Sequence, residues 1–119
     1  MTTQPYVYQV DSVAKVTDGD TYWMYLSIGF RETILVNVRL AGFDCPERNS
    51  GSDREKAAAK DATDLAAMWL AEGPVWVRTE KDPDSFGRWL GYVWRDTTDG
   101  GREFLGDVLR DQGLASVWP

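Results

Sequence analysis

Acidic side chains and arginines recur together in three short stretches of this chain. In the first stretch, Asp18-Gly19-Asp20-Thr21, one glycine separates two aspartates. Asp-Gly between two hydrophobic runs predicts a tight hairpin, because both residues tolerate a positive φ. Alternate residues of an extended chain point to the same side, so the carboxylates of Asp18 and Asp20 should converge on one small volume. Standing alone, the pair is typical of an ordinary polar turn.

The second and third stretches add arginines at the ends of expected strands. Residues 39–47 combine Arg39 with two carboxylates, Asp44 and Glu47, and residues 82–94 place Arg88 at the start of another strand. Each stretch alone is typical of an exposed loop. Together, the three stretches provide carboxylates for a divalent cation, guanidiniums for phosphate oxygens, and a spare carboxylate that can take a proton from water.

The composition limits the chemistry that these residues can perform. The chain has 119 residues, no histidine and one cysteine, Cys45. These counts exclude histidine-based nucleophilic catalysis, the usual zinc sites and an internal disulfide. Any metal must therefore be a hard cation held by oxygens. The net charge of −6 argues mildly against a nucleic-acid ligand, although the local field at a site matters more than the total charge.

The length indicates one domain, which we expect to span residues 1–119. No apolar run approaches the roughly 20 residues that span a bilayer, so no membrane partner is expected. The N-terminus lacks the basic and apolar regions of a signal peptide, which favours a cytoplasmic over a secreted location. We expect a monomer.

Apolar residues that alternate with a period of two predict five strands. Their expected ranges are 6–16, 21–28, 33–40, 75–80 and 88–94. In the second strand one face carries Tyr22, Met24, Leu26 and Ile28, and in the third strand it carries Ile34, Val36, Val38 and Leu40.

Two helices complete the expected set of elements. Ser52 and Glu55 form the sequence pattern of a capping box, and Gly73-Pro74 ends the helix that follows. A second helix is expected over residues 103–113. Five strands with a helix between the third and fourth predict a mainly β fold with helices (α+β), namely a five-stranded OB-fold barrel with two covering helices.

The sequence resembles the staphylococcal nuclease (thermonuclease) family over about residues 6–118. The matching stretches are VTDGDTYWM, VRLAGFDCPE, DSFGRWLGYV and LRDQGLASV, and they occur in the order that the family has. The resemblance implies an OB barrel that hydrolyses phosphodiester bonds in DNA and RNA, with little sequence specificity. The implied cofactor is Ca²⁺ rather than Mg²⁺, and the implied substrate is single-stranded or locally melted nucleic acid.

The resemblance also implies a metal site. Asp20 and Asp44 would bind the ion through their side chains, and Cys45 would bind it through its backbone carbonyl. Asp18 would lie close to the ion or to its waters. The family commonly has threonine where this chain has Cys45, a change that the backbone role should tolerate.

The catalytic residues implied by the resemblance are Glu47, Arg39 and Arg88. Glu47 would orient and deprotonate the attacking water, and the two arginines would hold the scissile phosphate and stabilise its transition state. Phe86 stands where the family often has a tyrosine that reaches the nucleotide. Trp118 lies near the place of another such tyrosine, so both are candidate substrate contacts.

Two other functions are compatible with an OB barrel. One is a domain that binds nucleic acid or a protein partner without turnover, and the other is a structural module stabilised by calcium. A domain that had lost its activity should also have lost members of the acid–arginine set. Because Asp20, Arg39, Asp44, Glu47 and Arg88 are all present, the sequence favours an active metal-dependent nuclease.

Overall fold

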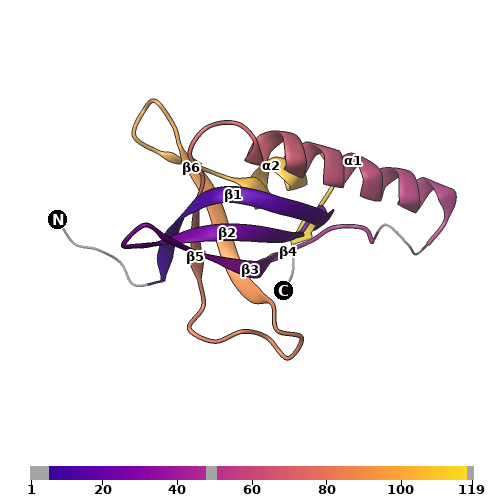
Figure 1. The fold of residues 1–119 in the computed structure, drawn as a ribbon. Helices are drawn as coiled ribbons and strands as arrows, with labels where there is room; N and C mark the ends of the chain where they lie inside the picture. The colour runs from indigo at the N-terminus through magenta and orange to yellow at the C-terminus, as the bar shows by residue number, and fades with distance from the viewer. Residues whose placement is uncertain (1–5, 48–50, 118–119) are drawn as a thin grey trace.

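A closed five-stranded barrel forms the centre of the molecule (Figure 1). The computed structural model describes residues 6–47 and 51–117. The barrel strands are β1 (Val7–Asp18), β2 (Thr21–Gly29), β3 (Glu32–Leu40), β5 (Trp76–Thr79) and β6 (Trp89–Asp96). Neighbouring strands are antiparallel except β3 and β6, whose parallel pairing closes the barrel. The prediction of an OB-type barrel with two helices is confirmed.

Helix α1 (Asp53–Leu70) packs on the barrel through its C-terminal part. The Ser52 hydroxyl accepts a hydrogen bond from the backbone N–H of Glu55, whose carboxylate accepts one from Ser52, so the predicted capping box is confirmed. The side chains that α1 buries are Ala59, Ala62, Ala66, Trp69 and Leu70. Its first turns extend beyond the barrel (Figure 1). Among the described residues, neither helix is long and apolar enough to cross a membrane.

The second helix, α2 (Leu105–Asp111), is shorter than the predicted 103–113. Glu103 and Phe104 belong instead to strand β7 (Arg102–Phe104), which pairs with β6. Strand pairing prevails there because Phe104 packs against Trp94 and Glu103 forms an ion pair with Arg95.

Two further strands, β4 (Phe43–Asp44) and β8 (Ser116–Val117), pair with each other outside the barrel. Each has two residues, which is too short for a periodic pattern, and neither was predicted. Their pairing attaches the loop that carries Asp44 to the C-terminal segment.

The predicted inward faces of β2 and β3 are buried except at one end of the barrel. Tyr22, Met24 and Leu26 are at most 2% exposed. The alternation therefore predicted the barrel interior correctly. Ile28 and Ile34, which lie beyond the filled interior, are about half exposed.

Strand β1 curves because its pairing with β2 skips one residue of β1 at three places. As a result Val10, Val13 and Val16, spaced three apart, all lie opposite inward-facing residues of β2. The β1 residues that lie opposite the outward-facing residues of β2 are also three apart. They are Ser12, Lys15 and Asp18. A spacing of three is not the period of a regular strand, so the sequence pattern could not predict these faces.

The turn between β1 and β2 consists of Gly19 and Asp20, and neither has a positive φ. The predicted tight hairpin is confirmed, but the expectation that Asp18 and Gly19 form its turn through positive φ angles is wrong. The glycine is needed for space instead. A Cβ on Gly19 would lie 2.7 Å from the Cβ of Ala62 in α1 and 3.1 Å from the Sγ of Cys45.

Replacing this glycine should destabilise the fold. We expect Gly19→Ala to lower the free energy of unfolding by about 1–3 kcal/mol, because the added methyl overpacks the contact with α1. Urea unfolding followed by tryptophan fluorescence measures this change. The double variant Gly19→Ala/Ala62→Gly removes the clashing methyl, so it should lose less stability than the sum of the two single variants. Strict additivity would contradict the steric explanation.

Candidate functional site

One cavity of about 210 Å³ collects side chains from the β1–β2 turn, the end of β3, the loop after β4 and the start of β6. Its lining residues are Asp18, Asp20, Thr21, Arg39, Asp44, Glu47 and Arg88. Six of these seven residues are the acids and arginines to which the sequence analysis assigned roles. They come from distant parts of the chain, and the β2–β3 and β3–β6 pairings bring them together.

The Arg39 side chain is 9% exposed, and its guanidinium contacts two of the cavity carboxylates. Its Nη1 donates hydrogen bonds to the backbone carbonyls of Leu40 (3.0 Å) and Phe43 (2.6 Å). Its Nη2 donates to Oδ1 of Asp44 at 3.1 Å, and Nη1 lies 3.5 Å from Oδ2 of Asp20. A buried charge needs such partners, and here they fix the two carboxylates relative to each other.

Asp20 is buried and connects two segments of the site. Its Oδ2 accepts a hydrogen bond from the backbone N–H of Cys45 at 2.8 Å, and its Oδ1 accepts one from the Thr21 hydroxyl at 3.0 Å. Thr21 had no assigned role in the sequence analysis. The bond to Cys45 holds the loop after β4 against the start of β2.

The remaining carboxylates are more open to solvent or lie around the cavity wall. The Asp44 side chain is 63% exposed, and Asp18 and Glu47 also line the cavity. Among the described residues, no three Asp, Glu or Cys side chains lie close enough to form a metal site by themselves. The donor set still suits a hard cation, because its side-chain donors are oxygens and such ions complete their coordination with backbone carbonyls and water.

The Cys45 side chain does not line this cavity. Burial, reinforced by the nearby Asp20 carboxylate, raises the pKa of the Cys45 thiol to about 12. The thiol is therefore protonated at neutral pH and poorly nucleophilic. Any role in the site belongs to the backbone of Cys45.

Of the two candidate substrate contacts, the structure describes Phe86, which does not line the cavity. Phe86 is 81% exposed, and the guanidinium carbon of Arg88 lies 5.3 Å from the centre of its ring. Trp118 lies outside the described residues. The structure therefore brings together the acids and arginines but not Phe86.

Asp84 was missed by the sequence analysis although it orients Arg88. Its Oδ1 accepts hydrogen bonds from the backbone N–H groups of Phe86 and Arg88, both at 2.9 Å, and its Oδ2 accepts one from Nε of Arg88 at 3.0 Å. Desolvation alone would raise the pKa of Asp84, but the backbone hydrogen bonds from Arg88 and Phe86 and the guanidinium together lower it. Asp followed by a short turn is a known signal for such bonds and could have identified it.

Loss of the Asp84 carboxylate should misplace Arg88. We expect Asp84→Asn to lower kcat/KM for the phosphodiester hydrolysis that the family resemblance implies about 10- to 100-fold, because the amide can still accept the backbone bonds but no longer pairs with the guanidinium. Steady-state kinetics measure this loss. Asp82→Asn, in the same loop, is the matched control and should behave like the wild type.

The effect of Asp84 should depend on the side chain that it positions. In an Arg88→Ala background, Asp84→Asn should cause no further loss of kcat/KM. A full additional loss in the double variant would contradict the positioning role.

A comparison with protein families matches residues 37–119 to the family described as Staphylococcal nuclease homologue. The matched part includes Arg39, Asp44, Cys45, Glu47 and Arg88, and it leaves out the β1–β2 turn. A comparison with curated proteins finds no match.

Proposed function

The chain belongs to the staphylococcal nuclease family, and we propose that it is a calcium-dependent phosphodiesterase that hydrolyses DNA or RNA with little sequence specificity. The observation that carries the proposal is the meeting of four carboxylates and two arginines in one cavity. Family membership supports a nuclease-like domain that acts on nucleic acid. The proposed substrate is single-stranded or locally melted.

Ca²⁺ would be held by the side chains of Asp20 and Asp44 and by the backbone carbonyl of Cys45, with Asp18 nearby. When bound, the ion would polarise the phosphate and offset the charge that develops on its oxygens. Ca²⁺ is proposed over Mg²⁺ because it accepts irregular sets of six to eight oxygens, whereas Mg²⁺ demands a near-ideal octahedron. Ligands from separate segments of the chain suit the more tolerant ion.

Arg39 and Arg88 would bind the oxygens of the scissile phosphate. Guanidiniums can donate two parallel hydrogen bonds to a phosphate, and these bonds strengthen as negative charge grows toward the transition state. Arg39 is already held by two carbonyls and two carboxylates, and Arg88 by Asp84. Donors fixed in advance need little reorganisation during the reaction, which is the condition for strong electrostatic stabilisation.

Glu47 would take the proton from the attacking water. Among the four cavity carboxylates, Asp20 and Asp44 are the proposed metal ligands and are paired with Arg39, and Asp18 ends β1 next to the turn that carries Asp20. Glu47 follows β4 in the chain, lines the same cavity and is not one of the proposed metal ligands. A carboxylate that is not a metal ligand can accept a proton without releasing the ion.

Removing the proposed base should reduce turnover but not metal binding. We expect Glu47→Gln to lower kcat by about 10²- to 10⁴-fold, the usual contribution of a general base. Calcium affinity, measured by titration calorimetry, should remain nearly unchanged because no ligand is lost. Equal turnover in the variant and the wild type would exclude this role for Glu47.

Removing a proposed metal ligand should instead weaken the binding of calcium itself. We expect Asp20→Asn to weaken calcium binding by more than about 10-fold, since even outer partners of a metal site cost that much. The asparagine can still accept the Cys45 N–H bond, so the fold should persist. Asp64→Asn, on the exposed face of α1, is the control for charge. An unchanged calcium titration in Asp20→Asn would place the ion elsewhere.

A further inference from the structure

Three outward-facing residues connect the cavity to the open face of the sheet. Asp18 of β1 lies opposite Thr21 of β2, which lies opposite Arg39 of β3. All three line the cavity. Residues directly opposite each other on neighbouring strands share one face of the sheet, so this row marks the face on which the cavity opens.

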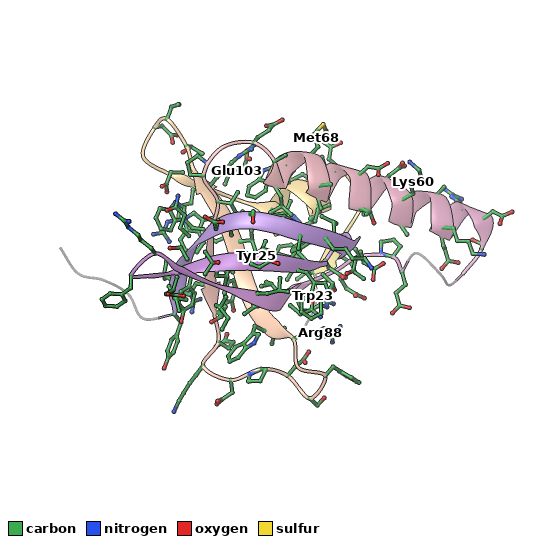
Figure 2. All side chains as sticks on the ribbon, in the orientation of Figure 1. Trp23, Tyr25, Lys60, Met68, Arg88 and Glu103 are labelled. Atoms are coloured by element: carbon green, nitrogen blue, oxygen red, sulfur yellow. The ribbon has the colours of Figure 1, made fainter. Side chains whose placement is uncertain are left out.

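Two more rows follow on the same face, each two residues further along β2. The second row is Lys15, Trp23 and Asn37, and the third row is Ser12, Tyr25 and Leu35. Each step along the strand is about 7 Å, so Trp23 lies in the row adjacent to the cavity. Figure 2 shows Tyr25 and then Trp23 along β2, toward the end of the barrel where Arg88 is labelled.

The large apolar side chains of the second and third rows are open to solvent. Trp23 and Tyr25 are each 38% exposed, and Leu35 is 44% exposed. Within the described residues, neither aromatic ring stacks on another ring or on a guanidinium. The barrel is filled by the alternate residues Tyr22 and Met24, so folding does not require large rings on the outer face.

Aromatic residues are common on strands because they pack well on a pleated surface, so exposure alone decides little. Two features distinguish Trp23 and Tyr25 from ordinary strand aromatics. Trp23 lies in the row next to the one that lines the cavity, and the cationic side chain of Lys15 lies in the same row as Trp23. Lys15 is exposed and forms no ion pair in the part of the chain that the structure describes. A lysine beside an exposed indole combines a phosphate contact with a stacking surface.

We propose that the rows through Trp23 and Tyr25 bind the strand that continues from the scissile phosphate, with both rings stacking on bases and Lys15 contacting the backbone. The proposal rests on the proposed function for the position of that phosphate. It selects single-stranded nucleic acid, because in a duplex the base faces are covered by their neighbours. It also gives this acidic chain a local cationic and aromatic surface where its substrate must lie.

Binding without turnover tests the stacking directly. The probe is a fluorescein-labelled oligothymidylate of about 12 nucleotides, followed by fluorescence anisotropy in the presence of a chelator. Trp23→Leu keeps an apolar side chain but removes the π face, and it should weaken binding roughly 5- to 100-fold. Trp23→Phe should retain most of the affinity. Phe30→Leu is the control, because Phe30 is 99% exposed at the tip of the β2–β3 hairpin.

The phosphate contact has its own readout. Lys15→Gln should reduce the slope of log K against log salt concentration by about 0.7, the value for one phosphate contact to a single strand. Lys60→Gln, on the exposed face of α1, should leave the slope unchanged. An unchanged slope in Lys15→Gln would show that Lys15 does not contact the phosphate backbone.

Hydrolysis separates this inference from the proposed function. With calcium, Trp23→Leu should raise KM for the oligonucleotide but not for a thymidine p-nitrophenyl phosphodiester, which is too short to leave the cavity. Failure of the wild type to bind the oligonucleotide, equal binding by Trp23→Leu, or equally tight binding of a duplex would overturn the inference. Weaker binding by Trp23→Leu in a protein that hydrolyses neither substrate would support the inference and contradict the proposed function.

Discussion

The buried guanidinium of Arg39 is the interaction on which the site depends. A positive charge removed from water must be paired, and this one is held by two backbone carbonyls and by the carboxylates of Asp20 and Asp44. The contacts with Phe43, Asp20 and Asp44 attach the end of β3 to β4 and to the β1–β2 turn. One charge therefore sets the relative positions of three segments, and the proposed metal ligands are two of its partners.

The barrel satisfies this constraint through closure and close packing. The parallel pairing of β3 with β6 places Arg39 opposite Leu90, so Arg88 reaches the same cavity. Three residues of β1 are skipped in its pairing with β2, and the resulting bend places Asp18 in the row that lines the cavity. Gly19 allows α1 to pack directly on the turn. The fold thus brings like-charged carboxylates together at a place where guanidiniums offset their repulsion.

Much of this arrangement could be predicted from the sequence because it lies in contiguous patterns. The alternation in β2 and β3, the capping box of α1 and the acid–arginine stretches each occupy a few successive residues. Other features depend on contacts between distant segments and leave no local pattern. The Cys45 N–H bond to Asp20 and the three-residue spacing of β1 arise only after the chain has folded. Asp84 lies between these cases, since its bonds are local but its importance comes from the position of Arg88.

We propose that this cavity catalyses metal-dependent hydrolysis of phosphodiesters. Its most direct test is the cleavage of single-stranded DNA and RNA by the wild-type chain with Ca²⁺, with Mg²⁺ and with a chelator, beside Arg88→Ala. We expect cleavage with Ca²⁺ that is lost with the chelator and in the variant. Absence of cleavage by a folded wild-type protein with either ion would contradict it and would leave a domain that binds nucleic acid without turnover.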